Sequence, residues 1–295
     1  MDITEEEFLN KGHRACAGCP MALIYRYALK GLGPKTIVTI PASCLTVLQG
    51  MQGFCSVKVP IIHTCFETTA ASASGISASL KQQGKDKEIT VVGFAGDGGT
   101  VDIGIQGLSG AAERRDDFIY CCYDNEAYMN TGTQRSGSSP WGAITTTTPI
   151  KGKKNHKKNF IMIMEAHGLS YVASISPSHP ADIISKFQAA KERRGQGVRY
   201  IHAISPCPPG WGHDSNQSIQ VAKLAVETGF WPLYEIIDGT LILSKPSKHL
   251  VNPKYRKPIS EYLKIQRRFR KLTDEDIKEW QNYVDDLWEE IQKRI

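Results

Sequence analysis

Short apolar runs alternate along the chain with segments of helical periodicity. Residues 89–95, ITVVGFA, form a continuous apolar and β-branched run, which is typical of a strand covered on both faces of a parallel sheet. Residues 118–123 repeat this pattern, and the intervening VDIGIQGLSGAAERR has apolar positions at helical spacing. Strands and helices that alternate in this way predict an α/β fold with a mostly parallel sheet between two layers of helices.

The same pattern predicts further elements on both sides of this unit. We expect strands at 36–40, 171–175 and 198–204, the last of these being the final strand of the chain, and helices at 21–30, 68–80, 159–166 and 180–193.

Near residue 244 the alternation gives way to prolines and charges, which divides the chain into a domain of residues 1–243 and an extension of residues 244–295. Within the extension, Thr273 and Asp276 resemble a capping box ahead of an amphipathic helix that carries Trp280 and Val284. An apolar stripe of this kind needs a partner surface. We expect the extension to leave the core and to contact another subunit.

Composition and charge narrow the class of protein. The N-terminus lacks the basic and apolar regions of a secretory signal, and no apolar run approaches the ~20 residues that span a bilayer, which indicates a cytoplasmic protein without a membrane segment. The net charge is +6, with basic runs at 151–158 and 245–271. These runs indicate solvated surface or subunit contact, or else a docking patch for an acidic partner. No aromatic interleaving or nucleic-acid-binding motif accompanies them.

A glycine-rich turn, residues 96–99, follows the strand at 89–95. Such a turn before a helix presents backbone N–H groups to phosphate. Val101 stands where a dinucleotide fingerprint requires glycine or alanine. Asp97 would repel phosphate unless a divalent cation lay between them, and Mg²⁺ prefers such oxygen ligands. Asn125, after the next strand, is the expected second oxygen donor.

Four of the eight cysteines form a second constellation. Cys16 and Cys19 make a C-x-x-C pair, and single cysteines stand at Cys44 and Cys207. Four thiolates suit either zinc or a cubane iron–sulfur cluster, and spacing alone neither chooses between them nor excludes four unconnected thiols. Cys121 and Cys122 lie in a predicted core strand, and Cys55 and Cys65 follow no pattern.

The turn and the asparagine loop together resemble the magnesium and diphosphate motif of thiamine-dependent enzymes. The segments GHRACAGC, FAGDGGTVDIGIQGLSGA, CYDNEAYMNTGTQRS and SPCPPGWG are similar to the beta subunits of pyruvate:ferredoxin oxidoreductases, which belong to the 2-oxoacid:ferredoxin oxidoreductase family. Two positions depart from the family pattern, Pro20 and residues 41–43, and both leave the substrate open. The resemblance implies the three-layer thiamine diphosphate-binding fold.

The resemblance also assigns roles to individual residues. Asp97, Asn125 and the Ala127 carbonyl would bind Mg²⁺, and Asn130 would lie near the reacting end of thiamine diphosphate. Four further residues would border the cofactor, namely Gly96, Gly98, Gly99 and Tyr128. The ligands of a 4Fe-4S cluster would be Cys16, Cys19, Cys44 and Cys207. His63 and Glu67, in IIHTCFETT, are candidates for lining the active site, although a lone histidine is more often structural.

The function implied is the reversible, CoA-dependent oxidative decarboxylation of pyruvate to acetyl-CoA and CO₂, with electrons passed through the cluster to ferredoxin. An iron–sulfur cluster can take these electrons one at a time, which zinc cannot. Partners would be alpha, gamma and delta subunits, one of which supplies a carboxylate for the cofactor, so the chain alone should be inactive. A first alternative is the same reaction with a branched-chain, aryl or dicarboxylic 2-oxoacid, or with oxalate. A second is a non-redox thiamine decarboxylase or synthase with structural zinc. A third is a non-catalytic scaffold subunit.

Overall fold

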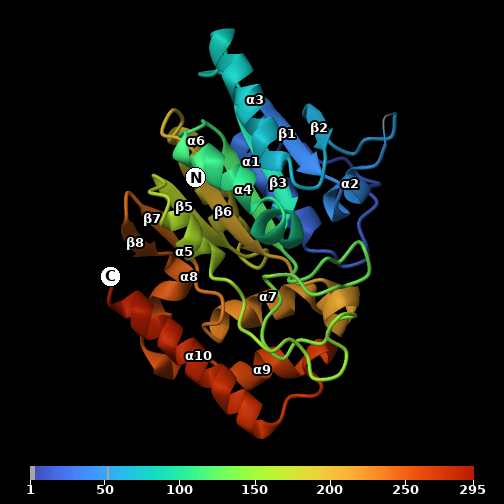
Figure 1. The fold of residues 1–295 in the computed structure, drawn as a ribbon, viewed down its shortest axis with the longest axis vertical. Helices are drawn as coiled ribbons and strands as arrows, with labels where there is room; N and C mark the ends of the chain where they lie inside the picture. The colour runs from blue at the N-terminus through green and yellow to red at the C-terminus, as the bar shows by residue number, and fades with distance from the viewer. Residues whose placement is uncertain (1–3, 52) are drawn as a thin grey trace.

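One twisted sheet runs through the molecule (Figure 1), and the computed structural model describes residues 4–51 and 53–295. The strand order within this described part is β2-β1-β3-β4-β6-β5-β7-β8. The strands are β1 Thr36–Pro41, β2 Ile61–Thr64, β3 Thr90–Gly96, β4 Ile119–Asp124, β5 Tyr171–Ile175, β6 Arg199–Ile204, β7 Tyr234–Ile237 and β8 Thr240–Leu243. Strands β1 to β6 pair in parallel, whereas β7 and β8 join antiparallel at one edge.

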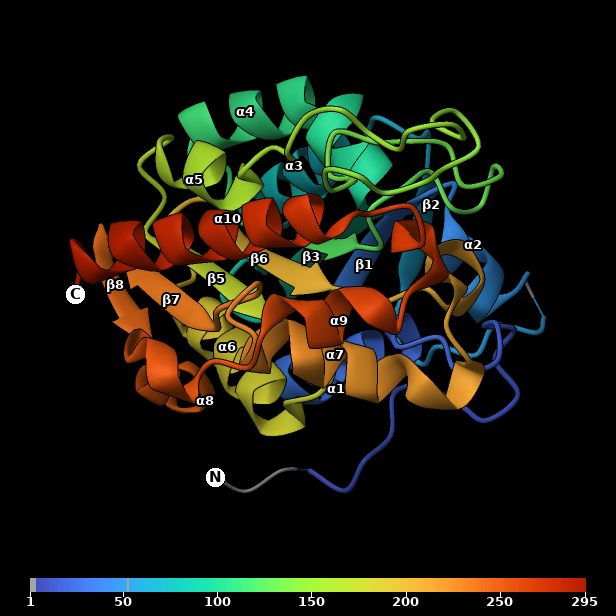
Figure 2. The same ribbon diagram turned by 90° about the horizontal axis from the view of Figure 1, so that it is seen from below.

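Helices cover both faces of this sheet. Helices α3, α4 and α5 lie on one side and α1 and α6 on the other (Figure 2). The helices are α1 Met21–Leu32, α2 Cys44–Gln49, α3 Thr69–Gln82, α4 Ile105–Glu113, α5 Phe160–Glu165, α6 Pro180–Glu192, α7 Ser218–Glu227, α8 Lys245–Lys248, α9 Ile259–Lys264 and α10 Asp274–Gln292, with short turns η1 Gly98–Asp102, η2 Pro208–Gly212, η3 Ser215–Gln217, η4 His249–Val251, η5 Pro253–Tyr255 and η6 Arg267–Phe269.

The central strands are buried at almost every position because helices cover both faces. The predicted α/β fold with a mostly parallel sheet is therefore confirmed. In the part of the chain that the structure describes, no helix is both long and apolar enough to cross a membrane.

The prediction that residues 198–204 form the last strand is wrong, because β7 and β8 follow as a hairpin. Asp238 and Gly239 form its turn with φ of 49° and 84°. An Asp-Gly pair readily adopts two positive φ angles, and it is a strong hairpin signal between apolar runs. The short edge strand β2 was not predicted either.

The C-terminal region corrects a second expectation. The capping box is present, since the Thr273 side chain accepts from the Asp276 backbone N–H and the Asp276 side chain accepts from that of Thr273. The apolar stripe does not leave the core, however: Trp280, Val284 and Trp288 are at most 1% exposed and pack in the chain's own hydrophobic core. The partner surface of α10 is thus intramolecular. Subunit contact through the polar face stays a prediction.

Parallel pairing determines where chemistry can gather. Strands β1, β3, β4 and β6 all end at the same edge of the sheet, and Cys44, Asp97, Asn125 and Cys207 each follow one of those ends within a few residues. Ligands of open α/β sheets bind in the crevice outside these carboxyl ends.

Candidate active site

A cavity of about 200 Å³ opens at this edge, between the loops that follow β1, β3 and β4. Its walls include Ser43, Cys44, Phe66 and Tyr123. Every residue that the sequence assigned to thiamine diphosphate lines it, that is Gly96, Asp97, Gly98, Gly99, Asn125, Ala127, Tyr128 and Asn130. The structure thus brings the two halves of the expected motif to one place.

Three oxygen donors meet inside this cavity. The amide terminus of Asn125 lies 3.0 Å from Asp97 Oδ1 and 2.8 Å from the Ala127 carbonyl oxygen. With the amide nitrogen in this position, Asn125 donates to both neighbours. With the amide oxygen there, a carboxylate, an amide and a backbone oxygen surround one point, and a cation at that point would relieve their mutual repulsion. This donor set is the one that Mg²⁺ prefers.

Asp97 is held firmly in this arrangement. It is 1% exposed, and the Ser136 hydroxyl donates a hydrogen bond to its Oδ2, which leaves Oδ1 toward Asn125. Burial, together with the nearby carboxylate of Asp124, raises the pKa of Asp97 well above its ordinary value. A divalent cation would compensate both effects, so the site fits a metal.

Two buried hydroxyls in the cavity wall also favour a polar ligand. Those of Ser43 and Tyr123 lie beside each other and make no hydrogen bond to any other group in the described chain. Gly98 leaves room for the Tyr128 ring in the cavity wall, since a Cβ there would lie 2.5 Å from a ring carbon of Tyr128. The Tyr128 hydroxyl in turn donates to Asp102 Oδ2 at 3.0 Å.

The four cysteines named from the sequence line a second cavity of about 70 Å³, and these are Cys16, Cys19, Cys44 and Cys207. Burial and the neighbouring thiols raise the pKa of Cys44 and Cys207 to about 12. A metal that binds the sulfurs as thiolates would overcome this penalty. Across residues 4–51 and 53–295, no three His, Cys, Asp or Glu side chains are arranged to hold one metal ion. The four thiols line one cavity rather than meeting at a single point.

The two cavities share a wall. Cys44, Asn125 and Asn130 line both of them. The cysteine site and the oxygen site thus lie against each other at the carboxyl ends of the strands, with Asn130 between them.

Cys121 and Cys122 are fully buried in β4, as expected for small hydrophobic side chains. Cys55 and Cys65 are exposed and line neither cavity.

A buried ionic network that the sequence did not reveal supports the Asn125 loop from behind. Lys157 Nζ lies 3.1 Å from Asp124 Oδ2 and 2.8 Å from Glu126 Oε1. Although burial disfavours the lysine charge, the two carboxylates raise the pKa of Lys157 above its usual value. The acidic residues on either side of Asn125 could have indicated this network from the sequence. The cations that pair with them, however, come from distant segments.

The C-terminal region contributes the second cation of this network. Arg268 is 4% exposed, and its guanidinium lies 2.6 Å from Glu126 Oε2 and 3.6 Å from the centre of the Trp211 ring. Trp211 Nε1 donates to the Asn125 carbonyl oxygen at 2.7 Å. Trp211 lies in η2, just after Cys207, so the segment that carries one cysteine of the second cavity also supports the Asn125 loop.

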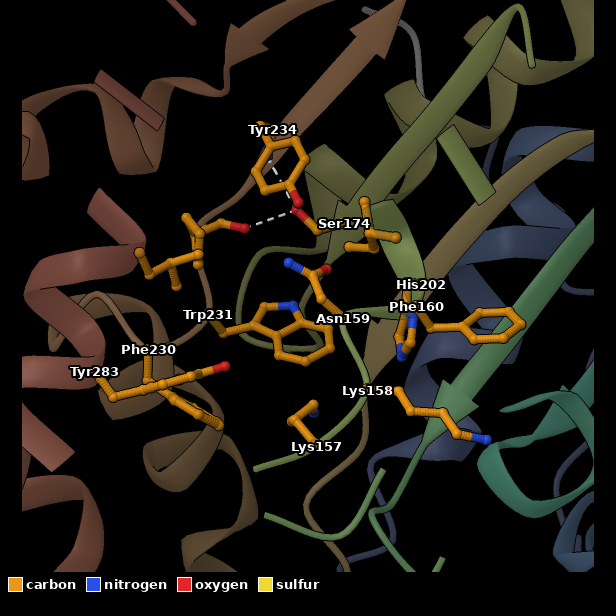
Figure 3. Close-up of a pocket in the computed structure, with 13 residues that line it drawn as sticks. Lys157, Lys158, Asn159, Phe160, Ser174, His202, Phe230, Trp231, Tyr234 and Tyr283 are labelled. Atoms are coloured by element: carbon orange, nitrogen blue, oxygen red, sulfur yellow. Dashed lines mark hydrogen bonds between the residues drawn. The ribbon is translucent and has the colours of Figure 1, made fainter. Parts of the chain in front are cut away.

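A third, smaller cavity of about 60 Å³ lies behind this network (Figure 3). Lys157, Trp231 and Tyr283 surround it, with the Lys157 ammonium 4.8 Å from the Trp231 ring centre. Ser174 Oγ bridges the Pro232 carbonyl and the Tyr234 N–H on its far wall. This volume holds only a few water molecules, so we interpret the cavity as a packing space beside α10 and not as a ligand site.

His63 and Glu67 do not join the cavity. Both are exposed, and neither is among the residues that line the 200 Å³ space. The His63 ring lies 2.9 Å from the Gln49 side-chain nitrogen. Phe66, between them in sequence, lines the cavity instead. Their role in the active site stays a prediction.

The comparisons with known proteins agree with this geometry. Residues 43–203 match the family described as "Thiamine pyrophosphate enzyme, C-terminal TPP binding domain". The chain is 48% identical to pyruvate synthase subunit PorB of Methanothermobacter thermautotrophicus over 99% of both chains. It is 46% identical to ketoisovalerate oxidoreductase subunit VorB of Pyrococcus furiosus over 99% of this chain and 94% of that one.

A solved structure, 2-oxoglutarate:ferredoxin oxidoreductase from Magnetococcus marinus with 2-oxoglutarate, coenzyme A and succinyl-CoA bound, shares the fold. It is similar at a TM-score of 0.59 and 22% identity, covering 73% of this chain and 79% of that chain. On the strength of the full-length relatives, the chain belongs to the 2-oxoacid:ferredoxin oxidoreductase family as its thiamine diphosphate-binding subunit, and it functions beside partner subunits.

Proposed function

We propose that this chain is the catalytic subunit of a complex that oxidatively decarboxylates pyruvate to acetyl-CoA and CO₂, reversibly, and passes the electrons to ferredoxin. The observation that carries this proposal is the shared wall of the two cavities: Cys44, Asn125 and Asn130 border both. An organic cofactor and an inorganic electron acceptor held on the two sides of one wall are close enough to exchange single electrons.

We assign Mg²⁺ to the Asp97 carboxylate, the Asn125 amide oxygen and the Ala127 carbonyl. In this role Ser136 fixes the rotamer of Asp97, and Gly98 lets the backbone approach the diphosphate. We assign a 4Fe-4S cluster to Cys16, Cys19, Cys44 and Cys207. The four thiols line one cavity, and a cluster suits the proposed reaction better than zinc because it can accept electrons one at a time, which zinc cannot.

When bound, thiamine diphosphate supplies the carbon nucleophile for the 2-oxoacid carbonyl, and the cluster supplies a one-electron acceptor. The chain's own residues position and enclose the reactants. Asn130, on the wall between the two cavities, is placed to hold a polar group of the substrate, and Phe66 and Met129 supply apolar walls that exclude water.

The lining of the 200 Å³ cavity also supports the need for a partner subunit. Among the described residues that line it, Asp97 is the only carboxylate, and we assign it to the metal. Nothing else in that wall serves as the carboxylate that the thiamine ring requires. The isolated chain should therefore bind Mg²⁺ and thiamine diphosphate but not turn over a 2-oxoacid.

Pyruvate is the substrate we propose, by analogy with the methanogen pyruvate synthase subunit. The ketoisovalerate relative is nearly as similar, so branched-chain substrate is the second candidate. The purified complex should show a higher kcat/KM for pyruvate than for 2-ketoisovalerate. A higher kcat/KM for 2-ketoisovalerate would instead identify the branched-chain 2-oxoacid as the substrate.

Two substitutions test the cofactor sites separately in the anaerobically purified complex. Asp97→Ala should lose Mg²⁺ and thiamine diphosphate and keep iron, and wild-type thiamine affinity would refute the magnesium assignment. Cys207→Ala should lose iron and the visible absorbance of the cluster. Cys55→Ala is the matched control, because Cys55 is exposed and lines neither cavity. Equal iron content in the Cys207 and Cys55 variants would refute the cluster assignment.

A further inference from the structure

Met129 lies on the wall between the two cavities. It lines the 200 Å³ cavity, and the next residue, Asn130, lines both cavities. Backbone hydrogen bonds hold the loop around it, because the Met129 N–H donates to the Ala127 carbonyl at 2.9 Å and the Met129 carbonyl accepts from the Gly132 N–H at 3.2 Å. The loop that presents Asn125 therefore also fixes the position of this methionine.

The thioether of Met129 extends toward the cysteine cavity. A Cβ built on Gly210 would overlap Met129 Sδ, would lie 2.5 Å from Met129 Cε, and would lie 3.5 Å from Cys207 Sγ. The end of the methionine side chain and the Cys207 thiol thus lie close together, beside the same part of the Gly210 backbone. Because Cys207 lines the 70 Å³ cavity, Met129 contributes to both sides of the shared wall.

Gly210 permits this close approach and does not serve an unusual backbone conformation. It is not among the glycines with positive φ, so another residue could adopt its backbone angles. A side chain at this position would, however, displace the Met129 thioether. The absence of a side chain at Gly210 is what lets Met129 pack beside Cys207.

The surroundings of this contact are apolar. Met129 and Cys207 pack against the same hydrophobic cluster, and the neighbouring Trp211 is fully buried. Of the four cysteines, Cys16 is exposed, whereas Cys207 is half-buried. Water can therefore approach the cysteine cavity at Cys16, while the methionine covers Cys207 toward the cofactor cavity.

An apolar cover of this kind changes the free energy of reducing a cluster. A cluster that accepts an electron gains negative charge, and water stabilises this charge better than an apolar wall does. The apolar residues around a metal site thus influence its reduction potential by limiting the access of solvent. Methionine suits this role because its flexible apolar side chain fills irregular gaps.

We propose that Met129 is a positioning residue that seals the wall at Cys207 and thereby lowers the reduction potential of the cluster. The inference rests on the proposed function, in which Cys207 is one of the four cluster ligands. A purely structural role for Met129 would stabilise the fold and leave this potential unchanged.

The potential is measured on the anaerobically purified complex by a redox titration followed by electron paramagnetic resonance, without any 2-oxoacid. The signal that Cys207→Ala lacks identifies the cluster of this chain. Met129→Gln keeps the length of the side chain and adds a polar group. It should raise the potential by about 59 mV, which is a tenfold change in the one-electron equilibrium constant. Met129→Ala opens the wall to water and should shift the potential in the same direction.

Two further variants serve as controls. Met129→Leu is apolar and of similar volume, so it should keep the wild-type potential. Met51→Ala should keep it too, since Met51 is 68% exposed and lines neither cavity. Iron content and melting temperature are measured for every variant, and Met129→Gln decides alone if Met129→Ala loses its iron.

A wild-type potential in Met129→Gln and Met129→Ala would overturn the proposal, and so would a shift in Met129→Leu as large as that in Met129→Ala. Because the titration needs no turnover, the expected shifts in a complex without 2-oxoacid activity would support the seal and refute the proposed reaction. A Cys207→Ala complex that keeps every signal of the wild type would refute the cluster assignment and this inference together.

Discussion

The guanidinium of Arg268 lies 2.6 Å from the Glu126 carboxylate, so the C-terminal region supports the loop that presents Asn125 and Ala127. Glu126 is 1% exposed and has a φ of 64°, a conformation that non-glycine residues seldom adopt. Its two ion pairs, with Lys157 and Arg268, hold it there.

Breaking this pair should destabilise the fold around the Asn125 loop. Arg268→Met leaves a buried carboxylate with one cation fewer, at a cost of about 3 kcal/mol in the free energy of unfolding. The double variant Glu126→Gln with Arg268→Met removes both charges and should recover part of this loss. Denaturant unfolding of the isolated chain measures both. A double variant no more stable than Arg268→Met would contradict the ion-pair explanation.

Gly98 should tolerate no side chain. An alanine there would place its Cβ 2.5 Å from the Tyr128 ring and push the ring from the cavity wall. We expect thiamine diphosphate affinity to fall about tenfold or more, since small displacements of positioning groups have large effects. Gly75→Ala, in α3, is the control: its Cβ would meet nothing within 4 Å, and stability should rise by about 0.5–1 kcal/mol. Wild-type cofactor affinity in Gly98→Ala would contradict this prediction, because it would show that the Tyr128 ring can move aside without disturbing the cofactor site.

Helix α10 should behave as part of the core. Trp280→Ala removes a side chain that is 1% exposed and packs near Phe230 and Phe269, so the free energy of unfolding should fall by roughly 3–5 kcal/mol. Glu290→Ala, on the exposed face, should change it by less than about 0.5 kcal/mol. Both are measured on the isolated chain. A Trp280 variant that loses stability only when partner subunits are present would instead assign this stripe to a subunit contact.

Acidification should weaken the fold through a buried histidine. His202 is 2% exposed and bonded to Tyr200 and Asp124, and burial lowers the pKa of His202 below its ordinary value of 6.5. Between the lowered pKa and 6.5 the unfolded chain binds more protons than the folded chain, so stability falls as pH decreases through this window. The pKa values of His179 and His213 are lowered in the same direction, also by burial.

Melting temperatures measured from pH 7.5 to 5 test this expectation. His202→Gln should flatten the slope below pH 6.5, since glutamine does not titrate. A variant whose slope matches that of wild type would assign the acid sensitivity to other groups.

Local patterns were sufficient for much of the fold. The run at 89–95 and the helical periodicity at 180–193 predicted β3 and α6 to within one residue, because continuous burial and one-sided burial each leave a distinct spacing of apolar residues. The β7–β8 hairpin carries a local signal as well, because the Asp238–Gly239 pair between two apolar runs favours a tight turn with positive φ angles.

The candidate site likewise has a part that the sequence predicts and a part that depends on tertiary contacts. By itself the sequence determined which residue types we propose for the cofactors: a carboxylate in a glycine-rich turn, an asparagine loop one unit later, and four cysteines. Only the tertiary structure decided that Cys44, Asn125 and Asn130 share one wall, that Arg268 and Trp211 support the Asn125 loop, and that α10 packs on its own chain. Residue spacing records local periodicity, whereas contacts between distant segments depend on strand order and on burial, which alone bring such segments together.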